Sequence, residues 1–136
     1  MKADIVVKGI IYNRVLKKIL LVQRCGSDDI GANTWENAGG NVEYDEAPEE
    51  AMMREIREET GLTDVNIRRV AYVTLVNADN PYLIIAYLCE VTTDEVKLSA
   101  EHQAYVWADR TEAIEKLPKA IIDDLESNKI FDEIER

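Results

Sequence analysis

Runs of β-branched and apolar residues recur along the chain and predict most of a sheet. Residues 5–12 and 18–24 read as two strands, and the second is apolar enough to be buried on both faces. Residues 66–76 and 81–91 are longer runs joined by the polar stretch NADN, which predicts a hairpin. A shorter strand is expected at residues 104–108. The alternation of these runs with turn-rich segments indicates a β-sheet as the central layer.

One helix is predicted between these strands, because apolar positions there recur at helical spacing. Its expected buried stripe consists of Met52, Met53, Ile56 and Thr60. The helix is expected to begin near Ala47, with Pro48 in the first helical position, where the missing N–H costs nothing. Gly61 is expected to end it as a left-handed cap.

The C-terminal part predicts helices that pack on the sheet. After a short extended segment at 96–99, the pattern favours two helices, at 111–117 and 118–134. Their expected packed stripe is Ala120, Ile121, Leu125 and Ile130. Three aromatic residues are expected in the core: Trp35, Tyr105 and Trp107. This order of elements predicts an α/β fold with a mixed sheet between helices.

Composition limits the classes of function. A chain of 136 residues with 46% hydrophobic content predicts one domain, residues 1–136. The net charge of -11 argues against a nucleic-acid polymer as partner. Cys25 and Cys89 have no metal-binding spacing, so two reduced thiols in a cytoplasmic protein are expected. The N-terminus lacks a signal-peptide layout, and no run reaches the ~20 apolar residues of a membrane helix.

The candidate chemistry lies on the predicted central helix. Glu55, Glu58 and Glu59 stand at i, i+3 and i+4 and share one arc of the helix. Such carboxylates repel one another unless positive charge lies among them, and Arg54 supplies part of it. A hard cation such as Mg²⁺ or Mn²⁺ would supply more. Ala51 falls on the same arc, so the sequence also predicts ligand approach to the backbone there.

The absence of histidine and cysteine from this stretch argues against zinc. The alternative is an ordinary solvent-exposed helix face that is stabilised by Arg–Glu pairs.

The wider spacing decides between these two interpretations. Nine positions follow a fixed pattern: Gly40, Glu46, Arg54, Glu55, Ile56, Glu58, Glu59, Gly61 and Leu62. This pattern resembles the Nudix box. The resemblance implies an α/β/α sandwich and hydrolysis of a nucleoside diphosphate that is linked to another group, with divalent metal held by the box glutamates.

The resemblance also implies roles for single residues. The carbonyl of Gly39 would join Glu55, Glu58 and Glu59 as a metal ligand, and Arg54 would orient the glutamates. Glu101, in a loop before the last strand, would approach the metal, and Arg24 would bind a phosphate. The proton acceptor is expected to be Glu59 or Glu101.

Three functions follow from the sequence. The first is a MutT-like pyrophosphohydrolase that converts a nucleoside triphosphate to the monophosphate and pyrophosphate. The stretch LSAEHQAYVW resembles diadenosine tetraphosphate hydrolases, which makes that activity the second. A non-catalytic nucleotide-binding module is the third. His102 is expected either on the surface or as a base or substrate contact, no membrane partner is expected, and family resemblance leaves a homodimer open.

Overall fold

A mixed β-sheet forms the centre of the molecule. The computed structural model describes residues 4–136. Within them, seven strands and four helices follow one another in this order: β1 (Asp4–Asn13), β2 (Lys18–Arg24), β3 (Trp35–Glu36), β4 (Ala38–Asn41), α1 (Pro48–Thr60), β5 (Asn66–Val76), β6 (Tyr82–Val91), β7 (His102–Ala108), α2 (Arg110–Lys116), α3 (Lys119–Ser127) and α4 (Ile130–Ile134). The strands expected from the sequence are all present, with ends that shift by one or two residues.

Strand β1 connects the two halves of the sheet. It runs parallel to β6 along its whole length, from Asp4 opposite Tyr82 to Asn13 opposite Val91. Its other edge is shared, because β4 pairs with the first half of β1 and β2 pairs only with its end. Strands β3 and β7 extend the sheet from β2, and β5 extends it from β6. The edge of β1 therefore opens where β4 gives way to β2, and this opening carries the site described below.

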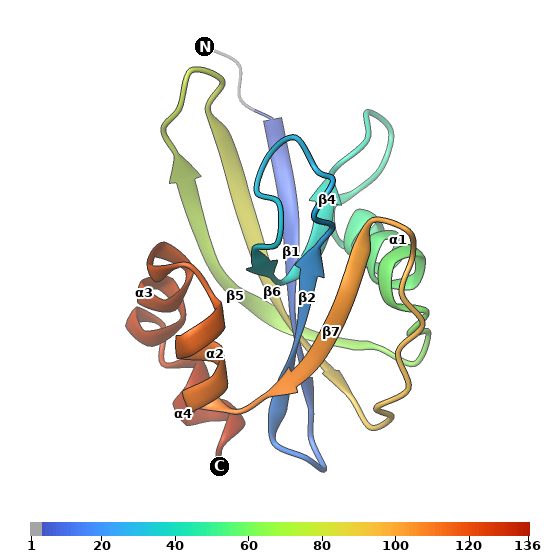
Figure 1. Ribbon diagram of the computed structural model, residues 1–136, viewed down its shortest axis with the longest axis vertical. Helices are drawn as coiled ribbons and strands as arrows, with labels where there is room; N and C mark the ends of the chain where they lie inside the picture. Colours follow the sequence, from blue (N-terminus) through green and yellow to red (C-terminus); the bar gives the residue numbers. More distant parts are fainter. Residues whose placement is uncertain (1–3) are drawn as a thin grey trace.

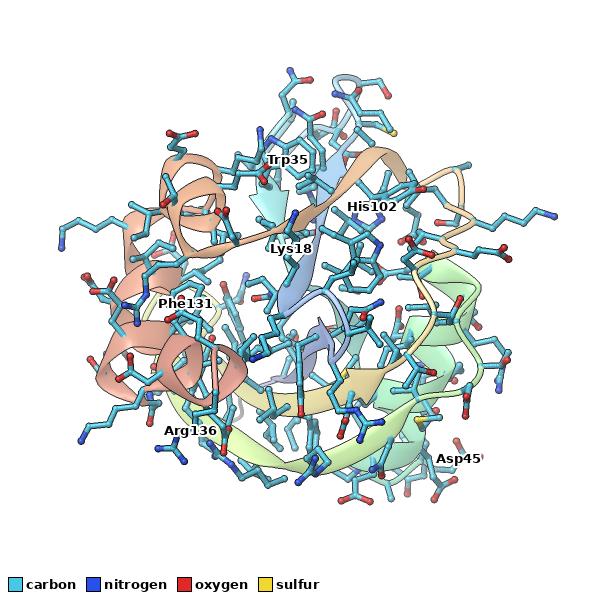
Figure 2. The ribbon with its side chains drawn as sticks, turned by 90° about the horizontal axis from the view of Figure 1, so that it is seen from below. Lys18, Trp35, Asp45, His102, Phe131 and Arg136 are labelled. Atoms are coloured by element: carbon cyan, nitrogen blue, oxygen red, sulfur yellow. The ribbon has the colours of Figure 1, made fainter. Side chains whose placement is uncertain are left out.

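Helices cover both faces of the sheet and enclose two apolar cores. One core lies between the sheet and helices α2–α4, and it includes Leu21, Leu125 and Phe131. The other lies between the sheet and α1, and it includes Val7 and Ile56. Figure 1 shows α1 on one side of the strands and the C-terminal helices on the other. The view from below gives the same arrangement, with Phe131 on the side of the C-terminal helices (Figure 2). The α/β/α sandwich is therefore confirmed.

Helix α1 matches its predicted limits and most of its predicted buried stripe. Pro48 is the first helical residue, and Gly61 ends the helix with a φ of 73° while its N–H donates to the Arg57 carbonyl. Met52, Ile56 and Thr60 are buried, and Met53 is half-buried. The prediction for Ala51 was wrong: this residue is fully buried against the sheet, so no ligand reaches the backbone there.

The C-terminal helices differ from the prediction in number. The segment expected as one helix at 118–134 is divided into α3 and α4, because Asn128 ends α3 and Lys129 takes a φ of 56°. The Asn128 side-chain amide donates to the Asp124 carbonyl at 2.8 Å, an interaction that competes with helix continuation. Ala120 is exposed, and Ile122 takes its place in the packed stripe.

One further expectation was wrong. Tyr105 is exposed, although Trp35 and Trp107 are half-buried against the two cores as expected. Residues 96–99, expected as a short extended segment, belong to no strand of the sheet, and Lys97 and Ser99 donate their N–H groups to the Thr60 and Glu59 carbonyls at the end of α1. Those contacts satisfy carbonyls that a helix end leaves unpaired. Among residues 4–136, no helix has the length and apolar character needed to cross a membrane.

Packing of α1 on the sheet should dominate the stability of this half of the molecule. Ile56 is fully buried, so Ile56→Ala should lower the free energy of unfolding by roughly 2–5 kcal/mol, because it leaves a cavity. Ile114→Ala, on exposed helix α2, makes the same chemical change at a position that is 47% exposed and should have little effect. Urea denaturation of both variants measures the difference; equal midpoints would contradict the described packing.

Candidate active site

The guanidinium of Arg54 contacts several carboxylates of the candidate site. Its guanidinium binds both carboxylate oxygens of Glu46, through Nε at 2.9 Å and Nη2 at 2.6 Å. Nη1 reaches Glu55 at 2.9 Å and Glu58 at 3.3 Å, and Nη2 also donates to the Asn41 carbonyl at 3.2 Å. The hydrogen bonds from Arg54, with one from the Glu43 backbone, lower the pKa of Glu46 to about 2. The predicted role of Arg54 in orienting the glutamates is consistent with these contacts.

Glycines bring the β4 backbone against the carboxylates of α1. The Gly39 N–H donates to Glu59 at 2.9 Å, which ties the strand to the helix. A Cβ atom at Gly40 would lie 2.6 Å from a carboxylate oxygen of Glu55, so only glycine leaves room for that side chain. A Cβ at Gly39 would collide with the Val7 carbonyl oxygen. The double glycine is thus explained by close approach of backbone to glutamate.

The three box glutamates differ in their surroundings. Glu59 is 2% exposed, and burial raises its pKa to about 7 against the opposing effects of the Gly39 hydrogen bond, His102 and Lys8. Burial also raises the pKa of Glu55, although Arg54 opposes the change. The Glu58 side chain is 58% exposed and contacts only Arg54 among the described residues. The site therefore combines a buried carboxylate, a half-buried one and a solvent-exposed one.

A buried ion pair lies next to Glu59. His102 is buried, and its Nε2 is 2.9 Å from Glu36, while its Nδ1 lies 3.9 Å from Glu59. Burial favours the neutral imidazole, but the hydrogen bond to Glu36 and the charges of Glu59 and Glu36 outweigh it, so the pKa of His102 is raised. Burial also opposes ionisation of Glu36, but His102, Lys8 and Arg24 lower its pKa to about 2. Of the two expectations for His102, the surface position was wrong.

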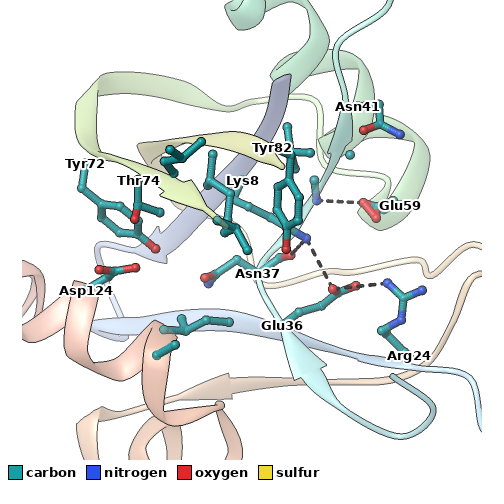
Figure 3. Close-up of a pocket in the computed structure, with 18 of the residues that line it drawn as sticks. Lys8, Arg24, Glu36, Asn37, Asn41, Glu59, Tyr72, Thr74, Tyr82 and Asp124 are labelled. Carbon is teal, nitrogen blue, oxygen red and sulfur yellow. Dashed lines mark hydrogen bonds and ion pairs between the residues drawn. The ribbon is translucent and has the colours of Figure 1, made fainter. Parts of the chain in front are cut away.

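These groups line one end of a cavity of about 1000 Å³. Arg24, Glu36, Glu59, Glu101 and His102 border this end. The cavity continues past Lys8 and Asn37 to β5 and α3, where Tyr72 and Asp124 form the other end (Figure 3). Tyr82 stands between the two ends in the same view. The volume matches that of a small-molecule site in other proteins, which is roughly 300–1000 Å³.

The structure places the remaining predicted residues at the same end of the cavity. Arg24 borders it and forms weak ion pairs, with Glu36 at 3.5 Å and with Asp28 at 3.4 Å. Its Nε also donates to the Ile30 carbonyl at 3.1 Å. Glu101 is exposed at the cavity edge, in the turn immediately before β7. The cavity thus brings together residues from three separate parts of the sequence.

The donor set fits a hard divalent cation. Glu55, Glu58, Glu59 and Glu101 carry carboxylate oxygens, and the Gly39 N–H contacts Glu59, whereas His102 is engaged with Glu36. Within residues 4–136, no three acidic, histidine or cysteine side chains stand close enough together to hold an ion as they are. The reason is that Glu55 and Glu58 turn toward Arg54. Oxygen ligands in this number suit Mg²⁺ or Mn²⁺ better than zinc.

Sequence reasoning missed the part of the site that lies on the sheet. Lys8, Glu36, Tyr72 and Asp124 come from four different elements, Asn37 lies between β3 and β4, and no common spacing links the five residues. Lys8 carried one available signal: a lysine inside an apolar strand needs a partner, and it contacts Glu36 at 3.3 Å. The other residues become recognisable only when the strands are assembled.

Comparison with known proteins agrees with the geometry. The family model of the NUDIX domain matches residues 3–127. The chain is 38% identical over 99 residues to a CTP pyrophosphohydrolase from Escherichia coli strain K12, a match that covers 72% of this chain and 71% of that protein. Some other curated relatives are longer proteins, of which the chain spans a quarter or less.

Solved structures show the same fold. A MutT protein from Methanosarcina mazei Go1 superposes with a TM-score of 0.78 and 30% identity, and 93% of each chain is covered. An Ap4A hydrolase from C. elegans superposes with a TM-score of 0.80 at 24% identity, over 95% of this chain and 97% of that one. The chain therefore belongs to the NUDIX family and is a Nudix hydrolase.

Proposed function

We propose that this protein is a metal-dependent pyrophosphohydrolase that cleaves a nucleoside triphosphate to the monophosphate and pyrophosphate. The observation that carries the proposal is the placement of Glu59 with Gly39 and Gly40 at one end of a nucleotide-sized cavity. Glu55 lies against Gly40, and Arg54 links Glu55 to Glu58. The similarity to a CTP pyrophosphohydrolase over most of both chains supports a triphosphate as substrate. Nudix hydrolases generally use divalent metal, and we propose Mg²⁺ or Mn²⁺ here.

The residues of the chain divide the work of the reaction. Glu55, Glu58, Glu59 and the Gly39 carbonyl would hold the metal, which supplies positive charge to the phosphate oxygens and lowers the pKa of a water. Arg54 would orient Glu55 and Glu58 through the hydrogen bonds that its Nη1 donates to both carboxylates. Arg24 and Lys8 face the cavity and would bind phosphate oxygens. Glu59 or Glu101 would accept a proton from that water.

The partner is thus a small nucleotide, and neither a nucleic-acid polymer nor a membrane is proposed. A homodimer stays a prediction of the family resemblance. We also propose a cytoplasmic location, which agrees with two unpaired thiols: Cys89 is buried and Cys25 is half-buried.

A substrate panel tests the reaction. Purified protein with Mg²⁺ is incubated with nucleoside triphosphates, dinucleoside polyphosphates and nucleoside diphosphate sugars, and the products are separated by chromatography. Formation of a monophosphate and pyrophosphate from a triphosphate, abolished by chelation, is the expected result. Cleavage of dinucleoside polyphosphates alone would replace the proposed substrate, and tight nucleotide binding without any cleavage would indicate a binding module.

Removing one box carboxylate should abolish most of the activity. Glu58→Gln should lower turnover by at least ~100-fold, because it removes a charged metal ligand, while the exposed position leaves the fold intact. Glu50→Gln makes the same change at an exposed position of the same helix, outside the cavity, and should stay near wild-type turnover. Near-normal turnover in Glu58→Gln, with circular dichroism unchanged in both, would reject the metal site.

The charge on Glu59 should make stability depend on pH when metal is removed. Its folded pKa is raised to about 7, so its contribution is fully present below its ordinary value of 4.5 and is lost as pH rises through about 7. Glu59→Gln removes that loss. In chelator, the unfolding free energy of Glu59→Gln minus that of wild type should therefore be larger at pH 8 than at pH 5, by about 1–3 kcal/mol.

Urea denaturation at the two pH values measures this gain. Adding Mg²⁺ should reduce it, because the cation compensates the buried charge in wild type. If wild type and Glu59→Gln show the same pH dependence in chelator, the described environment of Glu59 is wrong.

A further inference from the structure

The strongest unexplained feature of the cavity is the side chain of Asn37. This residue is 2% exposed, and its Nδ2 has no hydrogen-bond partner within residues 4–136. Its backbone carbonyl is taken by Lys8 at 3.3 Å, so the side chain alone is left without a partner. Figure 3 shows the side chain extending from Lys8 toward the end of the cavity where Tyr72 and Asp124 lie. A buried amide without a partner is destabilising, so the Nδ2 of Asn37 is available as a donor to a water or a ligand in the cavity.

Asp124 supplies the opposite polarity at the same end. Its carboxylate lines the cavity from α3 and makes no side-chain hydrogen bond or ion pair with residues 4–136. Burial, followed by the neighbouring charge of Asp123, raises the pKa of Asp124. Its neighbour Asp123 is instead paired with Lys119 at 2.8 Å. Asp124 is therefore an acceptor without a donor, facing the same space as a donor without an acceptor.

The walls of this end suit a flat ring. Tyr82 stands between the two ends of the cavity, and Ile84 and Ile121 add apolar surface. Burial, with the charge of Asp124, raises the pKa of Tyr72 to about 12, so its phenol stays neutral. Aromatic and aliphatic side chains around a few fixed polar groups are typical of sites for heterocyclic ligands. The proposed groups for phosphate and metal lie at the other end, which Arg24 and Glu59 line.

We propose that Asn37 and Asp124 form a base-reading subsite that selects an amino-substituted nucleobase. This inference rests on the proposed function, since the glutamate end holds the phosphates and leaves the base at the α3 end. The exocyclic amine would donate to the Asp124 carboxylate, and the adjacent ring nitrogen would accept from Asn37 Nδ2. Cytosine and adenine present this donor beside an acceptor; uracil and hypoxanthine present a keto oxygen and a ring N–H instead.

The arrangement of donor and acceptor in the subsite should disfavour bases that carry a keto group in place of the amine. A keto oxygen in place of the amine would face the lone pairs of the Asp124 carboxylate, and a ring N–H would face the Nδ2 donor of Asn37. Both contacts would bury polar groups without partners, which sites built for hydrogen bonding reject strongly. Neither residue is in the box motif, so the selection is separate from the chemistry at the phosphates.

Matched substrate pairs test the subsite. CTP against UTP, and ATP against ITP, differ in the amine or keto group, and initial rates give kcat and KM for each. Wild type should prefer the amino member of at least one pair by ~10-fold or more in kcat/KM, mainly through KM. Asp124→Asn offers both a donor and an acceptor, so it should reduce that preference by ~10-fold with kcat on the amino member little changed.

Further variants and a binding measurement keep the test decisive. Asn37→Ala should raise KM for the amino member, and Glu126→Gln removes the same charge as Asp124→Asn from an exposed part of α3 and should change nothing. If Asn37→Ala does not fold, Asp124→Asn on the partly exposed helix still decides. Calorimetric binding of CMP, UMP, AMP and IMP, without metal, should follow the same preferences.

The outcomes separate the two proposals. Hydrolysis of both members of each pair with equal efficiency, unchanged in Asp124→Asn, would overturn the subsite and leave the pyrophosphohydrolase intact. No hydrolysis of any triphosphate would overturn the proposed function. In that case the monophosphate titrations judge the subsite alone, and equal or undetectable binding of amino and keto members would overturn it.

Discussion

Crowding of carboxylates on one face of α1 is the constraint on which the site depends. Glu55, Glu58 and Glu59 lie within two helical turns, and each needs its charge compensated in a different way. Arg54 compensates the two that face outward, and it is itself fixed by both oxygens of Glu46. Glu59 makes no contact with Arg54; it accepts a backbone N–H from Gly39, and His102 and Lys8 provide nearby positive charge. The pattern of nine positions therefore includes both the mutually repelling carboxylates and the arginine that compensates part of their charge. A divalent cation, as proposed above, would compensate the remainder.

The fold contributes by bringing other segments to this helix. Because β1 pairs with β4 over its first half and with β2 only at its end, the sheet separates beside α1. Lys8 projects from β1 into that separation and binds Glu36 and the Asn37 carbonyl. Glu36 in turn binds His102 from β7, so three strands are connected by two polar contacts. These contacts hold the floor of the cavity between the phosphate end and the α3 end.

Features that depend on nearby residues in the sequence, such as helix ends and helical spacing, were predictable. Features that depend on how the strands and helices pack together were not. The limits of α1 followed from Pro48 and Gly61, and the proximity of Arg54 to Glu58 followed from helical spacing. His102 gave no such signal, since its burial results from pairing of β7 with β2 and its contact with Glu36 spans 66 positions of sequence. The division between α3 and α4 was missed because apolar spacing continued across Asn128, while the interruption comes from its side chain. Asn37 was overlooked because a single amide between two short strands is informative only once its burial is known.

The central claim is that the α1 carboxylates require a divalent cation, and direct metal binding tests it most closely. Titration of the protein with Mn²⁺, followed by electron paramagnetic resonance, measures the free ion without any substrate. The account predicts saturable binding in wild type, weakened at least ~10-fold when Glu55 and Glu58 are both replaced by Gln, while circular dichroism shows the same fold. Unchanged Mn²⁺ affinity in that double variant would contradict the account, because the metal would then be held elsewhere.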